Sequence, residues 1–200
     1  MSAKNRSGAS KAHDRYLTPP RLARAAFERL YELYGKELYG ATRFLEPGAG
    51  PGTFCRIAKN YGTKLKDVVG VELHNAEGRA ESGYQLVKAD FLRWQPKDKT
   101  LFDLSVSNPP FTFAEEFIRH NFALTAPNGY LLYLARIGLA ATKTRRDLWD
   151  TIPLKEIWLC RPRPSFVSEG GSDASEYAFF LMHKCHPQNR YDVVFRWLDW

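Results

Sequence analysis

The sequence predicts an α/β fold in which a mostly parallel β-sheet is flanked by helices. Three observations predict it. Short apolar or β-branched segments alternate with segments of helical spacing, which is the pattern of βαβ units. The chain has 200 residues, of which 44% are hydrophobic, enough to form the core of one domain. A glycine-rich turn directly follows the first expected strand, where open α/β sheets bind their ligands.

The N-terminal part of the chain is expected to begin with a tail and to continue into a helix. Residues 1–13 are polar, basic and without periodic apolar positions, so they are expected to form a disordered basic tail. Thr18 could cap a helix whose first turn holds Pro19 and Pro20. No internal repeat and no linker rich in glycine and serine follows, so residues 14–200 are expected to form a single domain.

Beyond Gly40, short apolar segments predict strands, and several of them are separated by helix-compatible segments. In chain order, the expected strands are Arg43–Glu46, Asp67–Glu72, Tyr84–Ala89, Phe102–Ser107, Tyr130–Arg136, Glu156–Cys160 and Tyr177–His183, and the expected helices are Thr53–Tyr61, Ala114–Leu124 and Lys143–Thr151. These elements predict a Rossmann-like, seven-stranded sheet. The alternation of Val193, Phe195 and Trp197 could add an edge strand.

Composition narrows the functional classes. The 29 Lys and Arg residues exceed the 22 Asp and Glu residues, giving a net charge of +7. A basic surface attracts nucleic acids through counterion release, although many proteins are mildly basic for solubility alone. No apolar run approaches the roughly 18 residues that suggest a membrane span. The polar N-terminus does not resemble a signal peptide.

The three cysteines, Cys55, Cys160 and Cys185, form neither an even-numbered disulfide framework nor a metal-binding pattern. We therefore expect no metal site and a reducing, cytoplasmic compartment.

The most informative motif is the segment from Glu46 to Gly52, in which a strand ends in a carboxylate and runs into a turn with glycines 48, 50 and 52. Glycine lets the backbone turn tightly and lets a ligand approach the main chain. A dinucleotide-binding GxGxxG motif would need glycine at Cys55, and no phosphate-binding GK[ST] sequence follows. A carboxylate suits a positively charged ligand, such as the sulfonium cofactor S-adenosylmethionine, better than a pyrophosphate. A connecting turn without a ligand is the alternative.

Two acidic residues follow later strands. Glu72 lies at the end of the second strand, at a spacing that suits hydrogen bonds to ribose hydroxyls. Asp90 follows the third strand and could accept from the amine of an adenine ring, with Phe91 against that ring. The alternative for Asp90 is a turn residue or helix cap.

The segment Asn108-Pro109-Pro110-Phe111 ends the fourth strand. Two consecutive prolines end strand pairing and stiffen the loop. A turn that only ends the strand would explain these prolines. A turn does not explain why an amide precedes the prolines and an aromatic residue follows them at the ligand-binding edge.

Together these motifs resemble class I S-adenosylmethionine-dependent methyltransferases that act on amino groups, above all the small phage-type N6-adenine DNA methyltransferases. The resemblance covers roughly Arg15 to Lys184. Tyr16-Leu17-Thr18-Pro19-Pro20 is similar to the family's N-terminal cofactor motif. The resemblance implies that Tyr16, Thr18 and Pro19 reach the methionine end of the cofactor.

The resemblance also assigns the remaining site residues. Near the cofactor it places Asn108, together with Glu46, Pro47, Gly48, Gly50, Gly52, Glu72, Asp90 and Phe91. The Asn108 oxygen and the Pro109 carbonyl would accept the hydrogens of adenine N6, held by the stiff Pro109-Pro110 pair. Phe111 would stack on a base swung out of the duplex.

Nucleic-acid contacts are expected at two further segments. Arg163-Pro164-Ser165-Phe166, followed by Asp173 and Tyr177, resembles the late loop of the phage enzymes, which suggests contacts from Arg163, Phe166 and Tyr177. Arg145 and Arg146 could contact phosphates. A solvated helix face and an ordinary surface loop are the respective alternatives.

The chain also departs from the family. No separate target-recognition domain is evident, which implies short or relaxed specificity, or specificity supplied by a protein partner. Glu46 stands where many members have Asp. The partner is expected to be DNA rather than RNA, but RNA adenine N6 and guanine N2 methyltransferases share the motif. A protein-glutamine methyltransferase is disfavoured by the positive charge and by Phe111 in place of tyrosine. A non-catalytic nucleic-acid-binding module with the same fold is the other alternative.

Overall fold

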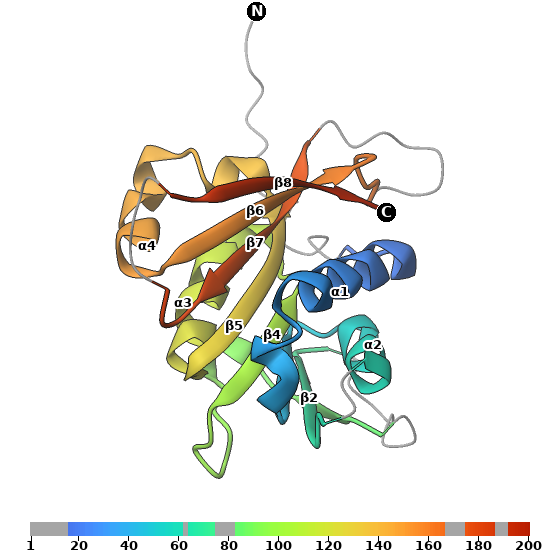
Figure 1. Cartoon of the computed structure of the whole chain (residues 1–200). Helices are drawn as coiled ribbons and strands as arrows, with labels where there is room; N and C mark the ends of the chain where they lie inside the picture. The colour runs from blue at the N-terminus through green and yellow to red at the C-terminus, as the bar shows by residue number, and fades with distance from the viewer. Residues whose placement is uncertain (1–15, 62–63, 75–82, 167–174, 187–191) are drawn as a thin grey trace, which may run out of the picture.

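A computed structural model describes residues 16–61, 64–74, 83–166, 175–186 and 192–200 of the chain (Figure 1). The expected tail at residues 1–13 and Asp173 lie outside these ranges. The described residues form an eight-stranded sheet with the order β3-β2-β1-β4-β5-β7-β6-β8. Neighbouring strands run parallel except at β7, which is antiparallel to both β5 and β6. The α/β class and the mostly parallel sheet are thereby confirmed.

All seven expected strands are present, with small differences at their ends. Their bounds are Arg43–Pro47 (β1), Asp67–Glu72 (β2), Gln85–Lys88 (β3), Phe102–Ser107 (β4), Thr125–Arg136 (β5), Leu154–Arg161 (β6) and Tyr177–His183 (β7). The C-terminal alternation forms an eighth strand, β8 (Val194–Asp199), which pairs in parallel with β6 at the sheet edge. The sheet therefore has eight strands rather than the expected seven, because β8 extends it beyond β6.

Helices cover both faces of the sheet (Figure 1). They are α1 (Pro20–Tyr34), α2 (Thr53–Tyr61), α3 (Ala114–Ala123) and α4 (Arg146–Thr151). Alternate strand residues divide between two cores. One contains residues of α1 and α2 with Phe44 and Phe179, and the other contains residues of α3 and α4 with Leu45 and Phe180. Within the described residues, no helix combines the length and apolar character needed to cross a bilayer.

Two expectations about helices are corrected. Helix α1 begins at Pro20 with Pro19 as its cap residue, and no side chain caps it. Thr18 is therefore not the cap: it lies one residue before the cap position, and its hydroxyl accepts from Asn108 Nδ2 instead. The expected helix at 143–151 is divided into a 3₁₀ turn at Lys143–Arg145 and α4, since the backbone of Arg145 (φ −104°, ψ 10°) leaves the α-helical range.

The strand order reverses between β1 and β4, which places the ends of these two strands beside each other. The Ser107 hydroxyl donates to the carbonyl of Pro47 at 2.7 Å and ties the two strand ends together. The turn that begins at Gly48 and the segment that begins at Asn108 therefore start from adjacent points of the sheet.

Candidate active site

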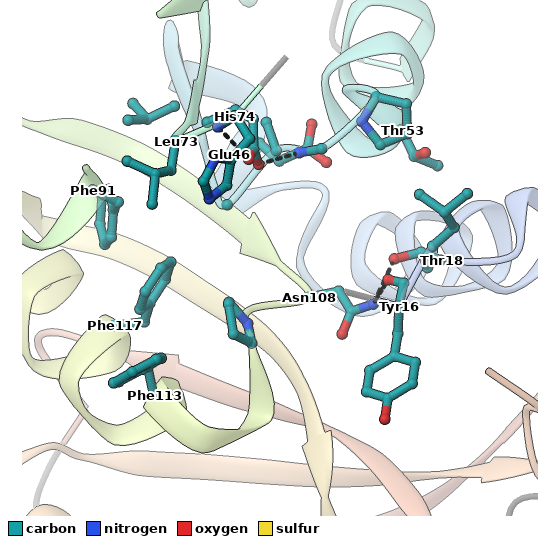
Figure 2. A pocket seen from close by; sticks show the side chains of 18 of the residues that line it. Tyr16, Thr18, Glu46, Thr53, Leu73, His74, Phe91, Asn108, Phe113 and Phe117 are labelled. Atoms are coloured by element: carbon teal, nitrogen blue, oxygen red, sulfur yellow. Dashed lines mark hydrogen bonds between the residues drawn. The ribbon is translucent and has the colours of Figure 1, made fainter. Parts of the chain in front are cut away.

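A cavity of about 950 Å³ opens at this point of the sheet (Figure 2). Ten of the sequence-predicted site residues line it: Tyr16, Thr18, Glu46, Gly48, Gly50, Glu72, Asp90, Phe91, Asn108 and Pro110. Five others, Pro19, Pro47, Gly52, Pro109 and Phe111, are not among the lining residues. The structure thus brings together residues that come from the N-terminal segment and from the ends of four strands.

The glycine-rich turn exposes bare main chain to the cavity at Gly50. Its backbone has φ +49°, and a Cβ built there would meet no atom within 4 Å. The Gly50 N–H donates to a Glu72 carboxylate oxygen at 2.8 Å, and the His74 N–H donates to the other at 2.9 Å. Glu72 is therefore held between the turn and the end of β2. Each oxygen accepts one of these bonds, which leaves acceptor capacity for a ligand hydroxyl.

Gly52 meets a different requirement. It has φ +74°, and a Cβ there would lie 2.5 Å from the hydroxyl oxygen of Tyr84. Glycine at this position therefore allows Tyr84 to pack beneath the turn, which accounts for Gly52 without contact with the cavity.

Glu46 is nearly fully buried, with 3% of its surface exposed. Its carboxylate accepts from the backbone N–H groups of Phe54 at 3.1 Å and Cys55 at 2.7 Å, in the first turn of α2. Burial raises the pKa of Glu46 to about 7, and the hydrogen bonds from Cys55 and Phe54 oppose the rise. The sequence did not reveal this contact with α2, although a carboxylate shortly before a helix start is a signal for it.

Asp90 caps a 3₁₀ turn, which is the alternative that the sequence offered beside a contact with adenine. It precedes the 3₁₀ turn Phe91–Arg93 and accepts from the Leu92 N–H at 3.1 Å, while its other oxygen lies 3.7 Å from Arg93 Nε. Phe91 is buried against Phe117, with ring centroids 5.0 Å apart. Together they form an aromatic wall that Figure 2 shows beside Phe113. Phe113, at the end of the 3₁₀ turn Phe111–Phe113, and Phe117, in α3, were not predicted. Their signal was the aromatic residues that follow the Asn-Pro-Pro-Phe segment directly.

Asn108 is held by the segment that precedes α1. Its Nδ2 donates to the Tyr16 carbonyl at 2.8 Å and to the Thr18 hydroxyl at 3.1 Å (Figure 2). A carbonyl can only accept, so the amide must turn its nitrogen toward Tyr16. The Oδ1 atom is buried and has no hydrogen-bond partner among the described residues. An unpaired buried acceptor is costly, and Asn108 lines the cavity, so its oxygen is suited to receive a donor from a ligand bound there.

Phe111 lies in an aromatic cluster rather than at the cavity wall. Only 8% of its surface is exposed. Tyr16 stacks on its ring, with centroids 5.3 Å apart and planes at 21°, and the rings of Phe166 and Tyr177 lie 5.9 and 5.1 Å away. The expectation that Phe111 stacks on a base therefore requires the Tyr16 ring to move. Tyr177 is fully buried, so the structure does not place it where nucleic acid could touch it.

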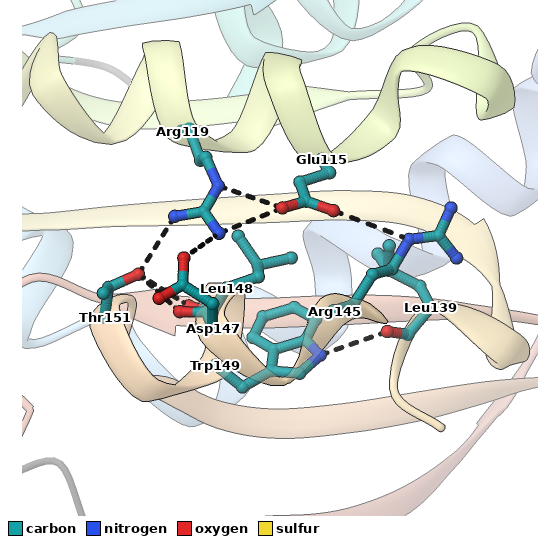
Figure 3. A network of polar contacts seen from close by, with 8 residues as sticks. All are labelled: Glu115, Arg119, Leu139, Arg145, Asp147, Leu148, Trp149 and Thr151. Atoms are coloured by element: carbon teal, nitrogen blue, oxygen red, sulfur yellow. Dashed lines mark hydrogen bonds and ion pairs between the residues drawn. The ribbon is translucent and has the colours of Figure 1, made fainter. Parts of the chain in front are cut away.

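The arginines expected to bind phosphate lie in ion pairs away from the cavity. Arg145 faces Glu115 at 3.8 Å, and Glu115 also pairs with Arg119, which reaches Asp147 at 2.7 Å (Figure 3). This network fastens α4 to α3. On the surface, Arg146 lies 3.6 Å from Asp150 and Arg163 lies 3.6 Å from Glu176. None of the three arginines lines the cavity.

Comparison with known proteins gives a likeness in structure but not in sequence. No protein-family model matches the sequence, and no match is found among curated proteins. One similar structure is a type I restriction-modification methyltransferase subunit from Streptococcus thermophilus, with a TM-score of 0.68 and 16% identity over 86% of this chain and 45% of that one. The chain thus spans less than half of that subunit.

Two further structures match over more of their own length. A proposed RNA methyltransferase from Pyrococcus horikoshii has a TM-score of 0.63 and 15% identity over 92% of this chain and 93% of that one. A proposed class I S-adenosylmethionine-dependent methyltransferase from Listeria monocytogenes has a TM-score of 0.64 and 15% identity over 96% and 68%. The protein has the fold of the class I methyltransferases.

Proposed function

We propose that the protein is an S-adenosylmethionine-dependent methyltransferase that acts on the N6 amine of adenine in DNA. The observation that carries the proposal is the buried Oδ1 of Asn108, which has no hydrogen-bond partner among the described residues, in a residue that lines a cavity bordered by a glycine-rich turn. The class I methyltransferase fold supports the same conclusion, because in such open α/β sheets ligands bind where the strand order reverses.

The residues around the cavity fit the cofactor. Gly50 offers open main chain, and Glu72 retains acceptor capacity for ribose hydroxyls. Phe91 and Leu73 supply apolar surface for an adenine ring, and the second oxygen of Asp90 could accept from its amine. Glu46 supplies a carboxylate for the positive charges of the cofactor. When bound, S-adenosylmethionine supplies an electrophilic methyl group on sulfur.

The protein residues would then orient the amine. The lone pair of the adenine amine is delocalised into the ring, so the site must favour a tetrahedral nitrogen that carries positive charge. In our proposal, Asn108 Oδ1 and the Pro109 carbonyl each accept one N6 hydrogen, which aims the lone pair and stabilises the developing charge. The product sheds a proton readily, so no strong base is required.

RNA methylation is the second candidate, and one observation favours it. The proposed RNA methyltransferase from Pyrococcus horikoshii matches this chain over nearly the full length of both proteins. The positive net charge suits either nucleic acid. We favour DNA because the motif order resembles the N6-adenine DNA enzymes, and we propose short or relaxed specificity, or specificity supplied by a protein partner.

The test is to incubate the protein with methyl-labelled S-adenosylmethionine and duplex DNA, single-stranded DNA or RNA, and to identify the modified nucleoside by mass spectrometry. We expect label in N6-methyldeoxyadenosine, and its loss in Asn108→Ala. Label in N6-methyladenosine or N2-methylguanosine of RNA would replace our assignment with the second candidate. The absence of label in every substrate, with the cofactor bound, would favour a non-catalytic binding module.

A further inference from the structure

The segment before α1 contacts the proposed catalytic amide directly. Thr18 is buried, and its hydroxyl oxygen accepts from Asn108 Nδ2 at 3.1 Å. The helix does not use this hydroxyl as a cap, although Thr18 precedes the helix closely. The sequence predicted Thr18 as a helix cap and, through the family resemblance, as a cofactor contact. It does not cap the helix, and its hydroxyl binds the Asn108 amide at the wall of the cavity.

We propose that Thr18 is a positioning residue for methyl transfer, which acts by fixing the orientation of the Asn108 amide. The inference rests on the proposed function. The Asn108 amide has two Nδ2 hydrogens, and the structure supplies an acceptor for each: the Tyr16 carbonyl at 2.8 Å and the Thr18 hydroxyl. The Tyr16 carbonyl can only accept, so it directs the amide nitrogen, and not the oxygen, toward Tyr16. Thr18 binds the second hydrogen and thereby restrains the amide plane.

The restraint matters because of where it leaves the oxygen. With both Nδ2 hydrogens bound by the N-terminal segment, Oδ1 is the unpaired end of the side chain. An acceptor restrained before the substrate arrives needs no reorganisation when positive charge develops on the amine. Without the Thr18 hydroxyl, one buried Nδ2 hydrogen loses its partner and the amide plane can rotate. The rotation would turn Oδ1 away from the position in which it accepts from the substrate amine.

The test compares Thr18→Val, which keeps the branched shape and loses the hydroxyl, with Thr18→Ser, which keeps the hydroxyl. Thr42→Val is the matched control, because the Thr42 hydroxyl binds Asp103 at the opposite end of β1. For each variant, kcat for methyl transfer and the Kd for S-adenosylmethionine are measured. We expect Thr18→Val to lower kcat about tenfold or more with an unchanged Kd, and Thr18→Ser to restore most of it. The control should match the wild type.

A weakened Kd with unchanged kcat in Thr18→Val would show that Thr18 serves the cofactor, and would overturn the inference. Equal kcat in all variants would overturn it as well. A second measurement does not need activity: the NMR signals of the Asn108 side-chain amide, assigned by their loss in Asn108→Ser. We expect both Nδ2 protons of the wild-type protein to be shifted downfield and to exchange slowly with water.

Rapid exchange of these protons in the wild type would contradict the inference even if Thr18→Val does not fold. The two failures are also distinguishable. If the wild-type protein transfers no methyl group to any nucleic acid, the proposed function fails. If it transfers normally and Thr18→Val does too, only the positioning inference fails.

Discussion

Asn108 combines two chemical properties in one side chain, and the structure uses both. Its nitrogen donates to the Tyr16 carbonyl and the Thr18 hydroxyl, and its buried oxygen has no partner among the residues that the structure describes. An aspartate could not donate to the Tyr16 carbonyl, so the same backbone position would repel it. The family resemblance implied that the Asn108 oxygen is an acceptor. The partners of its nitrogen come from a segment about ninety residues earlier, and sequence periodicity does not reveal such a contact.

Glu46 predicts a dependence of cofactor affinity on pH. Burial raises its pKa to about 7, so the carboxyl gains a proton as the pH falls through that value. A cationic cofactor favours the ionised form, so we expect S-adenosylmethionine to bind more tightly as the pH rises through about 7, with proton release below it. Isothermal titration in buffers of different ionisation enthalpy measures both effects. Glu46→Gln has no carboxyl group at this position and should lose both the pH dependence of the affinity and the proton release. An identical pH profile in that variant would contradict the assignment.

Substitution of Gly50 is predicted to have two separate effects, one on the stability of the fold and one on cofactor binding. Alanine at φ +49° is strained, and we expect Gly50→Ala to lower the free energy of unfolding by about 1–2 kcal/mol. No protein atom obstructs the added methyl group, which would occupy space beside the cavity. The Kd for S-adenosylmethionine should therefore rise by about tenfold or more. Gly40→Ala is the control, because its Cβ also meets no atom and Gly40 does not line the cavity. Equal affinity in both variants would show that the cofactor does not approach Gly50.

At the scale of elements, strand β8 shows what a local pattern can and cannot predict. The alternation of apolar residues predicted an edge strand, which the structure confirms. The pattern did not predict that Glu156 of β6, 2% exposed, pairs with Arg196 of β8 at 2.8 Å. Trp158 and Tyr34 also donate to this carboxylate. A buried charge acquires its partners through tertiary packing, which periodicity does not encode.

The Glu156–Arg196 pair predicts the larger effect of two substitutions at the β6–β8 contact. We expect Arg196→Met to lower the free energy of unfolding by about 1–2 kcal/mol, because the buried Glu156 would lose a charged partner whose own side chain is 37% exposed to screening solvent. Arg161→Met is the comparison, since Arg161 and Asp199 join the same two strands on the surface. That exposed pair should contribute less than about 1 kcal/mol. Urea denaturation followed by circular dichroism measures both, and equal losses would contradict the account.

The whole fold was largely predictable because the two cores impose a regular pattern on the sequence. Residues such as Phe44 and Leu45 face opposite sides of the sheet, and both sides are covered, so strands read as continuous apolar segments. The glycine-rich turn and the Asn108 segment were placed correctly at one edge for the same reason. The aromatic cluster around Phe111 was not predictable, because Tyr16 and Phe166 reach it from segments without strand or helix periodicity.

The net charge of the molecule predicts salt-dependent binding of nucleic acid, to which Arg145 should not contribute. The affinity for duplex DNA should fall as salt rises, with the slope of log Kd against log salt reporting the phosphates contacted. Arg145 is paired with Glu115, so Arg145→Ala should leave this slope unchanged. A decrease of the slope by about 1 would show that Arg145 contacts a phosphate after all. Fluorescence anisotropy with labelled duplex over a salt series gives the slope.

The most direct measurement is the single-turnover rate of methyl transfer in Asn108→Ala, at S-adenosylmethionine and DNA concentrations that saturate the variant. We predict a rate lowered by about 100-fold or more, because the acceptor for the reacting amine is lost. The substitution also removes the Nδ2 hydrogen bonds to Tyr16 and Thr18, so the cofactor Kd is measured in the same variant and is expected to stay close to that of the wild type. A wild-type rate in this variant would contradict the account, since the amine would then be oriented without Asn108.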